Sequence, residues 1–157
     1  RKFNDIGATF QKQIQRYEKI RDVISVSPMS GSDMLKIDTS LDMFVLVQMS
    51  SKGNLFTREV SKSIIDMISF EKLEGNDNIK GIICQNSEFI NTDLPVLTIK
   101  PGINLSATGD ALGQCYSNLN GDLPDLIVVG RGITQSADPA SEIKKYKVSR
   151  NSQKTEH

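Results

Sequence analysis

The chain has 157 residues, 38% hydrophobic and 24% charged, as expected for one ordinary globular domain. Its 19 basic residues balance 19 acidic ones, so charge gives no argument for a nucleic acid or an anionic membrane as partner. No apolar run approaches the roughly 20 residues that a membrane span needs. Two cysteines, Cys84 and Cys115, are too few for a disulfide framework or a zinc site and indicate a cytoplasmic protein with reduced thiols.

The apolar pattern predicts helices that alternate with short buried strands along the chain. Helices are expected over about residues 6–20, 32–37, 58–73 and 140–149, and strands within 22–31, 43–49, 79–86, 94–103 and 123–133. The first helix would bury Ile6, Phe10, Ile14, Tyr17 and Ile20. The polar end, residues 150–157, is expected to be a disordered tail outside a domain of residues 1–149.

Strands rich in Val and Ile that alternate with helices predict βαβ units and a parallel sheet. Two architectures fit, a doubly wound sheet and a (β/α)₈ barrel. In both, ligands bind at the carboxyl ends of the strands. Polar residues follow several of the predicted strands at this edge, namely Ser50, Ser51, Lys100 and Arg131.

The segment "GRGITQ" follows the last predicted strand and favours an anion site over a dinucleotide site. Gln135 stands where a third glycine would be needed for dinucleotide binding. Gly130 and Gly132 would allow backbone N–H groups to approach an anion, and Arg131 offers a bidentate guanidinium. The alternative is a simple turn with a solvated arginine.

Two further loops carry polar side chains. In "GDALGQCY", Gln114 and Tyr116 can both donate hydrogen bonds to phosphate oxygens, although an ordinary polar loop is the simpler interpretation. In "MSSKG", Ser50 and Ser51 could bind a base edge or cap the next helix, and Lys52 is expected to be solvated.

Acid–base chemistry through histidine is nearly excluded, because His157 is the only histidine and lies in the polar end. Lysine, carboxylate or tyrosine would have to supply it. In "RKFND", Lys2 could point inward from a strand end, and Asp5 could reach a neighbouring chain or the N-terminus of the next helix. On position alone, a surface ion pair is the simpler interpretation.

Five motifs in order, "RKFNDIGAT", "MSSKGNL", "IKPGI", "GDALGQCY" and "DLIVVGRGI", resemble the orotidine 5'-monophosphate decarboxylase family, particularly its eukaryotic form. The resemblance extends to about Tyr146. It implies a (β/α)₈ TIM barrel, of which this chain would cover about the end of strand 3 through strand 8. It also implies a homodimer with shared active sites, and decarboxylation of orotidine 5'-monophosphate to uridine 5'-monophosphate (UMP) without metal or organic cofactor.

The resemblance assigns roles to individual residues. Lys2 and Asp5 match the second and third members of the Asp-x-Lys-x-x-Asp signature. Lys2 would donate the proton to C6, and Asp5 would enter the partner subunit's site. The substrate-binding residues would be Thr9 at the ribose, Ser50 and Pro101 at the base, and Gln114, Tyr116, Gly130 and Arg131 at the phosphate.

The chain also departs from the family pattern. Ala8 replaces an asparagine, Lys100 replaces a threonine, and polar residues replace the usual final helix after Tyr146. The signature's first aspartate and an earlier catalytic lysine are not among the 157 residues, so these residues alone are expected to be inactive. The alternatives are a non-catalytic α/β domain that binds a phosphate ligand, and a fragment that only recruits a partner.

Overall fold

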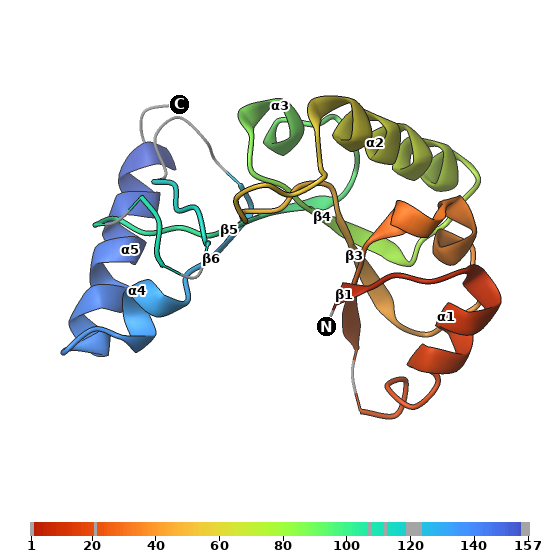
Figure 1. The fold of residues 1–157 in the computed structure, drawn as a ribbon, viewed down its shortest axis with the longest axis horizontal. Helices are drawn as coiled ribbons and strands as arrows, with labels where there is room; N and C mark the ends of the chain where they lie inside the picture. Colours follow the sequence, from red (N-terminus) through yellow and green to blue (C-terminus); the bar gives the residue numbers. More distant parts are fainter. Residues whose placement is uncertain (1, 21, 107, 112, 119–123, 155–157) are drawn as a thin grey trace. The chain divides into compact units, whose positions relative to one another are not determined.

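The computed structural model describes residues 2–20, 22–106, 108–111, 113–118 and 124–154, and strands alternate with helices along most of them (Figure 1). The chain divides into two compact units. Unit 1 comprises Arg1–Met49, Leu55–Ile83 and Leu94–Leu97, and unit 2 comprises Ser50–Asn54, Cys84–Asp93 and Thr98–His157.

Unit 1 is built on a parallel sheet. Its strands lie side by side in chain order, β1 (Lys2–Phe3), β2 (Val23–Val26), β3 (Asp42–Leu46) and β4 (Ile79–Ile83). A doubly wound sheet reverses its strand order at a switch point, whereas a barrel keeps neighbouring strands consecutive. The consecutive order within unit 1 therefore favours the barrel over the doubly wound sheet.

The centre of this sheet is apolar on both faces, as predicted for the run from Met43 to Met49. Met43 and Val45 are fully buried and Leu46 is 2% exposed. Across the sheet, a side chain at Gly81 would come within 2.2 Å of the Phe44 ring. Glycine is therefore required there for the Phe44 ring to lie across β4.

The first helix is shorter than its apolar pattern suggests. Helix α1 spans Gly7–Ile14, whereas the sequence predicted helix to residue 20. Phe10 and Ile14 are fully buried, but Ile6 and Ile20 are more than 60% exposed. The chain turns after Ile14, and Tyr17 packs edge-on against Phe3 with ring centroids 5.4 Å apart. The contact of Tyr17 with Phe3 of β1 thus takes the place of the last two predicted helical turns.

Two 3₁₀ turns follow β2, η1 (Pro28–Ser30) and η2 (Ser32–Leu35). The second occupies the segment for which a short helix was predicted, and it buries Met34 and Leu35. These turns carry the chain from β2 back towards β3.

Helix α2 (Arg58–Leu73) has the predicted boundaries. Its N-cap is Thr57, whose hydroxyl accepts a hydrogen bond from the N–H of Val60 at 3.3 Å. Ile64 and Ile68 form its buried stripe, and the buried hydroxyl of Ser61 donates to the Val47 carbonyl at 2.9 Å. Capping, periodicity and burial therefore agree along this helix.

Unit 2 contains a parallel strand pair, β5 (Leu97–Pro101) and β6 (Leu126–Val128), together with the short helix α3 (Ser87–Ile90). Residue 97 of β5 is assigned to unit 1. A reciprocal contact sets the register at the start of the pair. The Asp125 carboxylate accepts from the Thr98 N–H at 2.8 Å, and the Asp125 N–H donates to the Thr98 hydroxyl at 3.0 Å.

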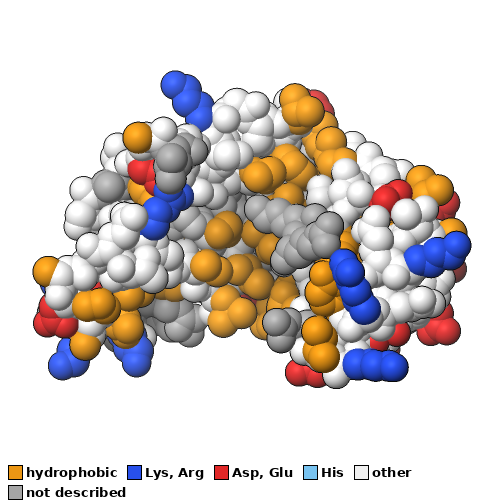
Figure 2. Space-filling model, turned by 60° about the horizontal axis from the view of Figure 1, so that its bottom comes forward, with side chains coloured by type: hydrophobic (Ala, Val, Ile, Leu, Met, Phe, Trp, Pro, Cys, Tyr) orange, Lys and Arg blue, Asp and Glu red, His pale blue; other side chains and the backbone are white. Residues whose placement is uncertain are grey.

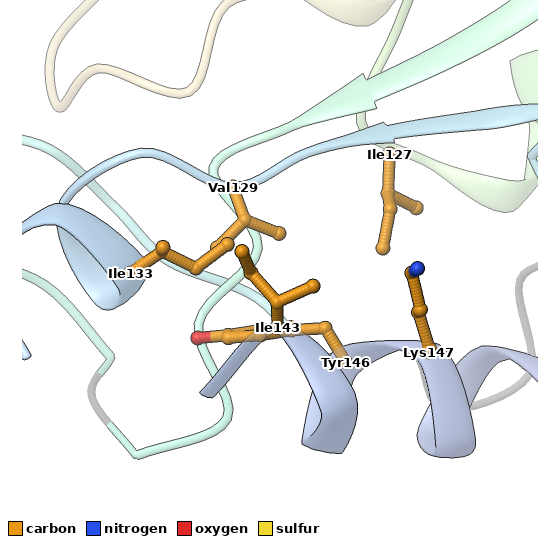
Figure 3. Close-up of a pocket in the computed structure, with 6 residues that line it drawn as sticks. All are labelled: Ile127, Val129, Ile133, Ile143, Tyr146 and Lys147. Atoms are coloured by element: carbon orange, nitrogen blue, oxygen red, sulfur yellow. The ribbon is translucent and has the colours of Figure 1, made fainter. Parts of the chain in front are cut away.

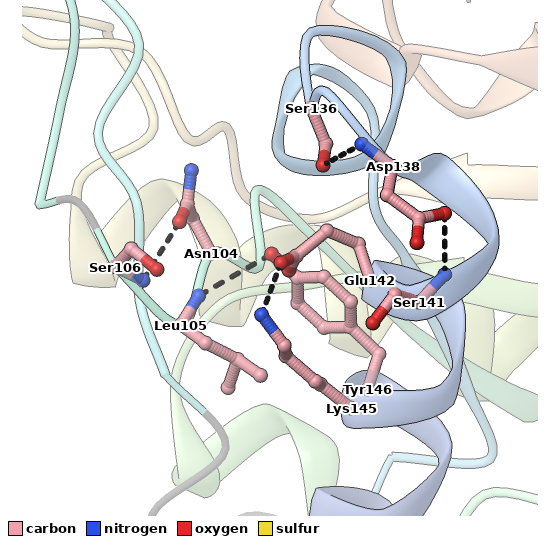
Figure 4. A network of polar contacts seen from close by, with 9 residues as sticks. All are labelled: Asn104, Leu105, Ser106, Ser136, Asp138, Ser141, Glu142, Lys145 and Tyr146. Carbon is pink, nitrogen blue, oxygen red and sulfur yellow. Dashed lines mark hydrogen bonds and ion pairs between the residues drawn. The ribbon is translucent and has the colours of Figure 1, made fainter.

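Two helices complete unit 2, α4 (Arg131–Thr134) and α5 (Pro139–Lys154). The Asp138 carboxylate accepts from the Ser141 N–H at 3.1 Å, so that Asp138 caps α5 with proline in the first helical position (Figure 4). Tyr146 anchors α5, since it is 4% exposed and its hydroxyl accepts from the Leu105 N–H at 3.4 Å (Figure 4).

An apolar pocket of about 290 Å³ lies between β6 and these helices (Figure 3). Its lining residues are Ile127, Val129, Ile133, Ile143, Tyr146 and Lys147. Three of these side chains, Ile127 of β6, Val129 just after it and Ile133 of α4, pack against Ile103 and Tyr146 in the core of unit 2. The pocket is thus a gap at the edge of that core.

Helix α5 corrects the prediction for the polar end of the chain. It continues to Lys154, whereas disorder was predicted from residue 150 and the usual final helix was expected to be missing. No Gly or Pro occurs between residues 140 and 154 to end the helix. Residues 155–157 of the predicted tail lie outside the described residues.

Large hydrophobic side chains also reach the surface (Figure 2). Val128 of β6 is 50% exposed and Val148 of α5 is 65% exposed. Of the helices in the described part of the chain, none is both long enough and apolar enough to cross a membrane.

Candidate active site

The nine residues predicted to form the site divide between the two units. Unit 2 carries the residues expected at the base and the phosphate, which are Ser50, Pro101, Gln114, Tyr116, Gly130 and Arg131. Unit 1 carries the predicted proton donor Lys2 with Asp5 and Thr9.

In unit 2, the loop after β3 lies against the loop that carries Gln114. The Ser50 carbonyl accepts from the N–H of Cys115 at 2.7 Å and from Nε2 of Gln114 at 3.2 Å. The N–H of Lys52 donates to the Gly113 carbonyl at 3.0 Å, while the Lys52 side chain is exposed, as predicted. The residue expected to read the base is therefore linked directly to one expected at the phosphate.

Gly102 allows this close approach. Its φ is +73°, in the left-handed region that favours glycine. A Cβ atom there would lie 2.9 Å from Nε2 of Gln114 and 3.1 Å from Cβ of Ser50. The glycine of "IKPGI" thus serves both the turn after β5 and the contact between the two loops.

The carboxylate of Asp110 is the centre of the polar contacts in unit 2. Its Oδ2 accepts from the Tyr116 hydroxyl at 2.8 Å and forms an ion pair with Nη1 of Arg131. The Arg131 guanidinium also lies over the Tyr116 ring, 5.8 Å from its centroid. A cation and a phenol therefore converge on one anionic oxygen of the chain itself.

The charges in this cluster affect one another. The hydrogen bond to Asp110 raises the pKa of Tyr116 above its ordinary value of 10.0, because ionised phenol could not donate it. The side chains of Arg131 and Asp110 are 33% and 23% exposed. Arg131 is therefore not the freely solvated arginine of the alternative interpretation.

The two glycines around Arg131 act differently. A Cβ at Gly130 would meet no atom within 4 Å, so the backbone there faces open space. A Cβ at Gly132 would lie 2.4 Å from the Tyr146 hydroxyl. Gly130 thus leaves room beside Arg131, whereas Gly132 serves the packing of α5.

Pro101 ends β5 and is half-buried, and its carbonyl accepts from Nε2 of Gln85 at 3.2 Å. Lys100, which replaces the family's usual threonine, is 3% exposed within the same strand. Lysine side chains are rarely buried to this extent, so Lys100 is not a solvated surface charge.

In unit 1, Lys2 lies in β1 opposite Ser25, and its side chain is outside the described part of the chain. Asp5 follows the strand and is half-buried. Its Oδ1 accepts from the Ile6 N–H at 2.9 Å and its Oδ2 from Nε2 of Gln13 at 2.8 Å. Thr9 lies on α1 and is exposed. Asp5 therefore lies at the N-terminus of α1, one of the two positions that the sequence allowed.

The motif that contains Asp110 was predicted from the sequence to bind phosphate through Gln114 and Tyr116, with no role for Asp110 itself. The spacing held a signal, since Asp110 precedes Gln114 by four residues in a glycine-bounded loop. Its Oδ1 accepts from the Gln114 N–H at 3.2 Å, and its N–H donates to the Gln114 carbonyl at 3.1 Å. An aspartate that closes such a turn is common in proteins, but its contact with the distant Arg131 requires the tertiary structure.

The chain is similar in sequence to known proteins. The chain is 31% identical to uridine 5'-monophosphate synthase of Caenorhabditis elegans and 32% identical to orotidine 5'-phosphate decarboxylase of Candida parapsilosis. In each case 94% of the chain is covered, but the chain spans only 32% and 60% of these relatives' own lengths.

Solved structures show the same fold. Orotidine 5'-monophosphate decarboxylase of Methanocaldococcus jannaschii, complexed with the inhibitor BMP, matches with a TM-score of 0.68 at 24% identity, over 96% of this chain and 72% of that one. The Sulfolobus solfataricus enzyme matches with a TM-score of 0.64 at 16% identity, over the same shares of the two chains. The predicted fold, part of a (β/α)₈ barrel, is thereby confirmed.

A family model matches most of the chain as well. The model described as the orotidine 5'-phosphate decarboxylase / HUMPS family covers residues 1–146. This range holds both the strand with Lys2 and the polar cluster around Asp110. The chain therefore belongs to the orotidine 5'-phosphate decarboxylase / HUMPS family.

Proposed function

We propose that this protein decarboxylates orotidine 5'-monophosphate to UMP and carbon dioxide, a step of pyrimidine biosynthesis. The observation that carries the proposal beyond family membership is the convergence of Tyr116 and Arg131 on one anionic oxygen. A phosphate monoester is an anion that a phenol and a guanidinium recognise well. Both residues lie in the unit that also carries Ser50, the residue proposed to read the base.

In the proposed reaction, loss of carbon dioxide leaves electron density on C6 of the pyrimidine. No cofactor is expected to accept it. The Lys2 ammonium would stabilise this charge as it develops and then donate its proton to C6. Its place in β1, beside the turn that carries Asp5, supports this role.

The remaining residues would bind parts of the substrate that do not react. Ser50 and Pro101 would contact the base, and Gln114, Tyr116 and Arg131, with the Gly130 backbone, would hold the phosphate. Binding energy from the phosphate can be used to order the reacting groups, so these contacts would affect the rate although they lie away from C6.

The homodimer with shared sites is part of the proposal. Asp5 and Thr9 would contribute to the partner subunit's site. The exposure of Thr9 in a single chain supports this, because a residue that reaches into a partner must lie at the surface. A cytoplasmic location and the inactivity of residues 1–157 taken alone also stay predictions, the latter because the signature's first aspartate is not among them.

Turnover by the complete protein, as its gene encodes it, tests the proposal. Conversion of orotidine 5'-monophosphate is followed by the change in absorbance as UMP forms. Lys2→Ala should reduce kcat by about 10²–10⁴-fold, the range for loss of a positioned proton donor. Lys12→Ala is the matched control, since Lys12 is an exposed lysine on α1.

Each outcome has a clear interpretation. Absence of turnover together with tight UMP binding would replace the enzyme by the alternative, a non-catalytic domain that binds a phosphate ligand. Equal kcat in Lys2→Ala and Lys12→Ala would remove Lys2 as proton donor and leave the decarboxylase assignment intact.

A further inference from the structure

The two donors proposed to hold the substrate phosphate already hold an anion of the chain itself. The Tyr116 hydroxyl has one proton to donate, and it donates it to Oδ2 of Asp110 at 2.8 Å. Nη1 of Arg131 is paired with the same oxygen. While this carboxylate keeps its place, an incoming phosphate oxygen therefore cannot receive the Tyr116 hydrogen bond and must share the Arg131 guanidinium with Asp110.

The position of Asp110 is set by the backbone of its own turn. Its N–H donates to the Gln114 carbonyl at 3.1 Å, and its carbonyl accepts from the Gly113 N–H at 3.2 Å. Its other carboxylate oxygen, Oδ1, accepts from the Gln114 N–H at 3.2 Å. The carboxylate thus projects from the turn that carries Gln114, a third residue proposed to contact the phosphate.

The ion pair between Asp110 and Arg131 is only partly exposed to solvent. Both side chains are partly buried, and the charge on Asp110 is shared between a cation and a neutral donor. A phosphate monoester carries more negative charge than one carboxylate and has three terminal oxygens. The phosphate can therefore displace the Asp110 carboxylate from Tyr116 and Arg131. A nucleoside without phosphate has no group that could do so.

We propose that Asp110 is an internal competitor of the phosphate. It occupies the anion position between Tyr116 and Arg131, and a nucleoside monophosphate binds by displacing it. This inference rests on the proposed function, because that function places the phosphate at these two residues. The inference predicts that part of the phosphate's binding energy is used to displace Asp110. Asp110 therefore lowers the affinity for phosphate esters and leaves the contacts with the base unchanged.

The test measures affinities of UMP and uridine by calorimetry in the complete protein. Asp110→Asn keeps an oxygen that can accept from the Gln114 N–H but removes the charge. It should bind UMP about 5-fold more tightly, the effect of removing one partly buried ion pair. Uridine affinity should not change. Asp93→Asn is the matched control, since it removes one exposed carboxylate elsewhere in unit 2.

Unchanged or weaker UMP binding by Asp110→Asn would overturn the inference, because Asp110 would then support the two donors rather than compete for them. Arg131→Ala tests the proposed function separately. If it leaves UMP affinity unchanged, the phosphate assignment itself fails. If it weakens UMP binding while Asp110→Asn does not strengthen it, only the competition fails. Should Asp110→Asn not fold, Asp110→Ser provides the same test, since its hydroxyl can also accept from the turn.

Discussion

Two carboxylates, Asp5 in unit 1 and Asp110 in unit 2, are held by different kinds of partner. Asp5 in unit 1 accepts from two neutral donors, the Ile6 N–H and the Gln13 amide, both in or beside α1. Asp110 in unit 2 accepts from a phenol and a guanidinium, and Arg131 lies 21 residues further along the chain. The contacts of Asp5 are local, whereas those of Asp110 tie distant segments together.

The regular structure of the two units differs in the same way. Unit 1 has four strands in parallel order and a buried core that includes β3 and α2. In unit 2 the loops are joined by isolated bridges, such as Ser51 with Gln114 and Gly109 with Cys115. Apolar burial therefore stabilises unit 1, while polar contacts around an anion organise the loops of unit 2. Under the proposal made above, the contacts around Asp110 rearrange when a phosphate binds, whereas the apolar core of unit 1 keeps its packing.

The largest expected effect comes from the core of unit 1. Ile68→Ala should lower the free energy of unfolding by about 2–5 kcal/mol, because Ile68 is fully buried. Leu73→Ala deletes a side chain of the same size from the same helix at a position that is 86% exposed, and should have little effect. Urea denaturation measures both. Equal losses would contradict the assignment of this core.

Arg131→Ala in unit 2 should affect ligand binding strongly and stability weakly. UMP affinity should fall by about 10–150-fold, the effect of losing one hydrogen bond to a charged group. The free energy of unfolding should change much less than in Ile68→Ala, because Arg131 is one-third exposed. Calorimetry and urea denaturation of the same variant compare the two quantities. A loss of stability as large as that of Ile68→Ala would show that the polar contacts of Arg131 stabilise unit 2 as much as apolar burial stabilises unit 1.

Gly102→Ala should disturb the contact between two loops of unit 2. We expect a loss of about 1–3 kcal/mol in the free energy of unfolding, from the positive φ and from crowding against Gln114 and Ser50. Gly113→Ala is the control, because its φ is +81° but no atom lies within 4 Å of its added Cβ. The difference between the variants in urea denaturation isolates the crowding. If the two variants lose the same free energy of unfolding, the positive φ alone explains why glycine is needed at residue 102.

Thr57→Ala should destabilise α2 by about 1 kcal/mol, since the N–H of Val60 loses its cap. Thr57→Ser keeps the hydroxyl and should retain most of the stability in the same denaturation experiment. UMP affinity should be unaffected, because the cap lies in unit 1. A change in affinity would indicate that α2 influences the phosphate contacts.

The smallest expected effect is a shift in the titration of Tyr116. The folded state raises the pKa of this phenol through Asp110, so its contribution to stability is present below about pH 10 and is lost as pH rises through the raised pKa. The tyrosinate absorbance of Tyr116, obtained by subtracting the titration of Tyr116→Phe, should develop at lower pH in Asp110→Asn. An unchanged midpoint would show that Asp110 does not hold the phenol.

Sequence predictions were accurate where several local signals agreed and inaccurate where only one was available. Helix α2 was predicted to the residue because its periodicity, cap and burial agree locally. Helix α1 was predicted too long, since the apolar residues Ile6 and Ile20 fit the helical period but are exposed. The end of α5 was mistaken for disorder because its polar residues lack an apolar stripe, although nothing in them breaks a helix.

The sequence by itself determined the parallel α/β class, the family motifs and the residue types at the strand ends. These depend on hydrophobic period and on short motifs, which are local properties of the chain. The tertiary structure alone placed Asp110 between Tyr116 and Arg131, and showed which glycine leaves room for a neighbouring loop. Contacts between segments far apart in sequence have no period to reveal them, because they depend on how strands and loops pack.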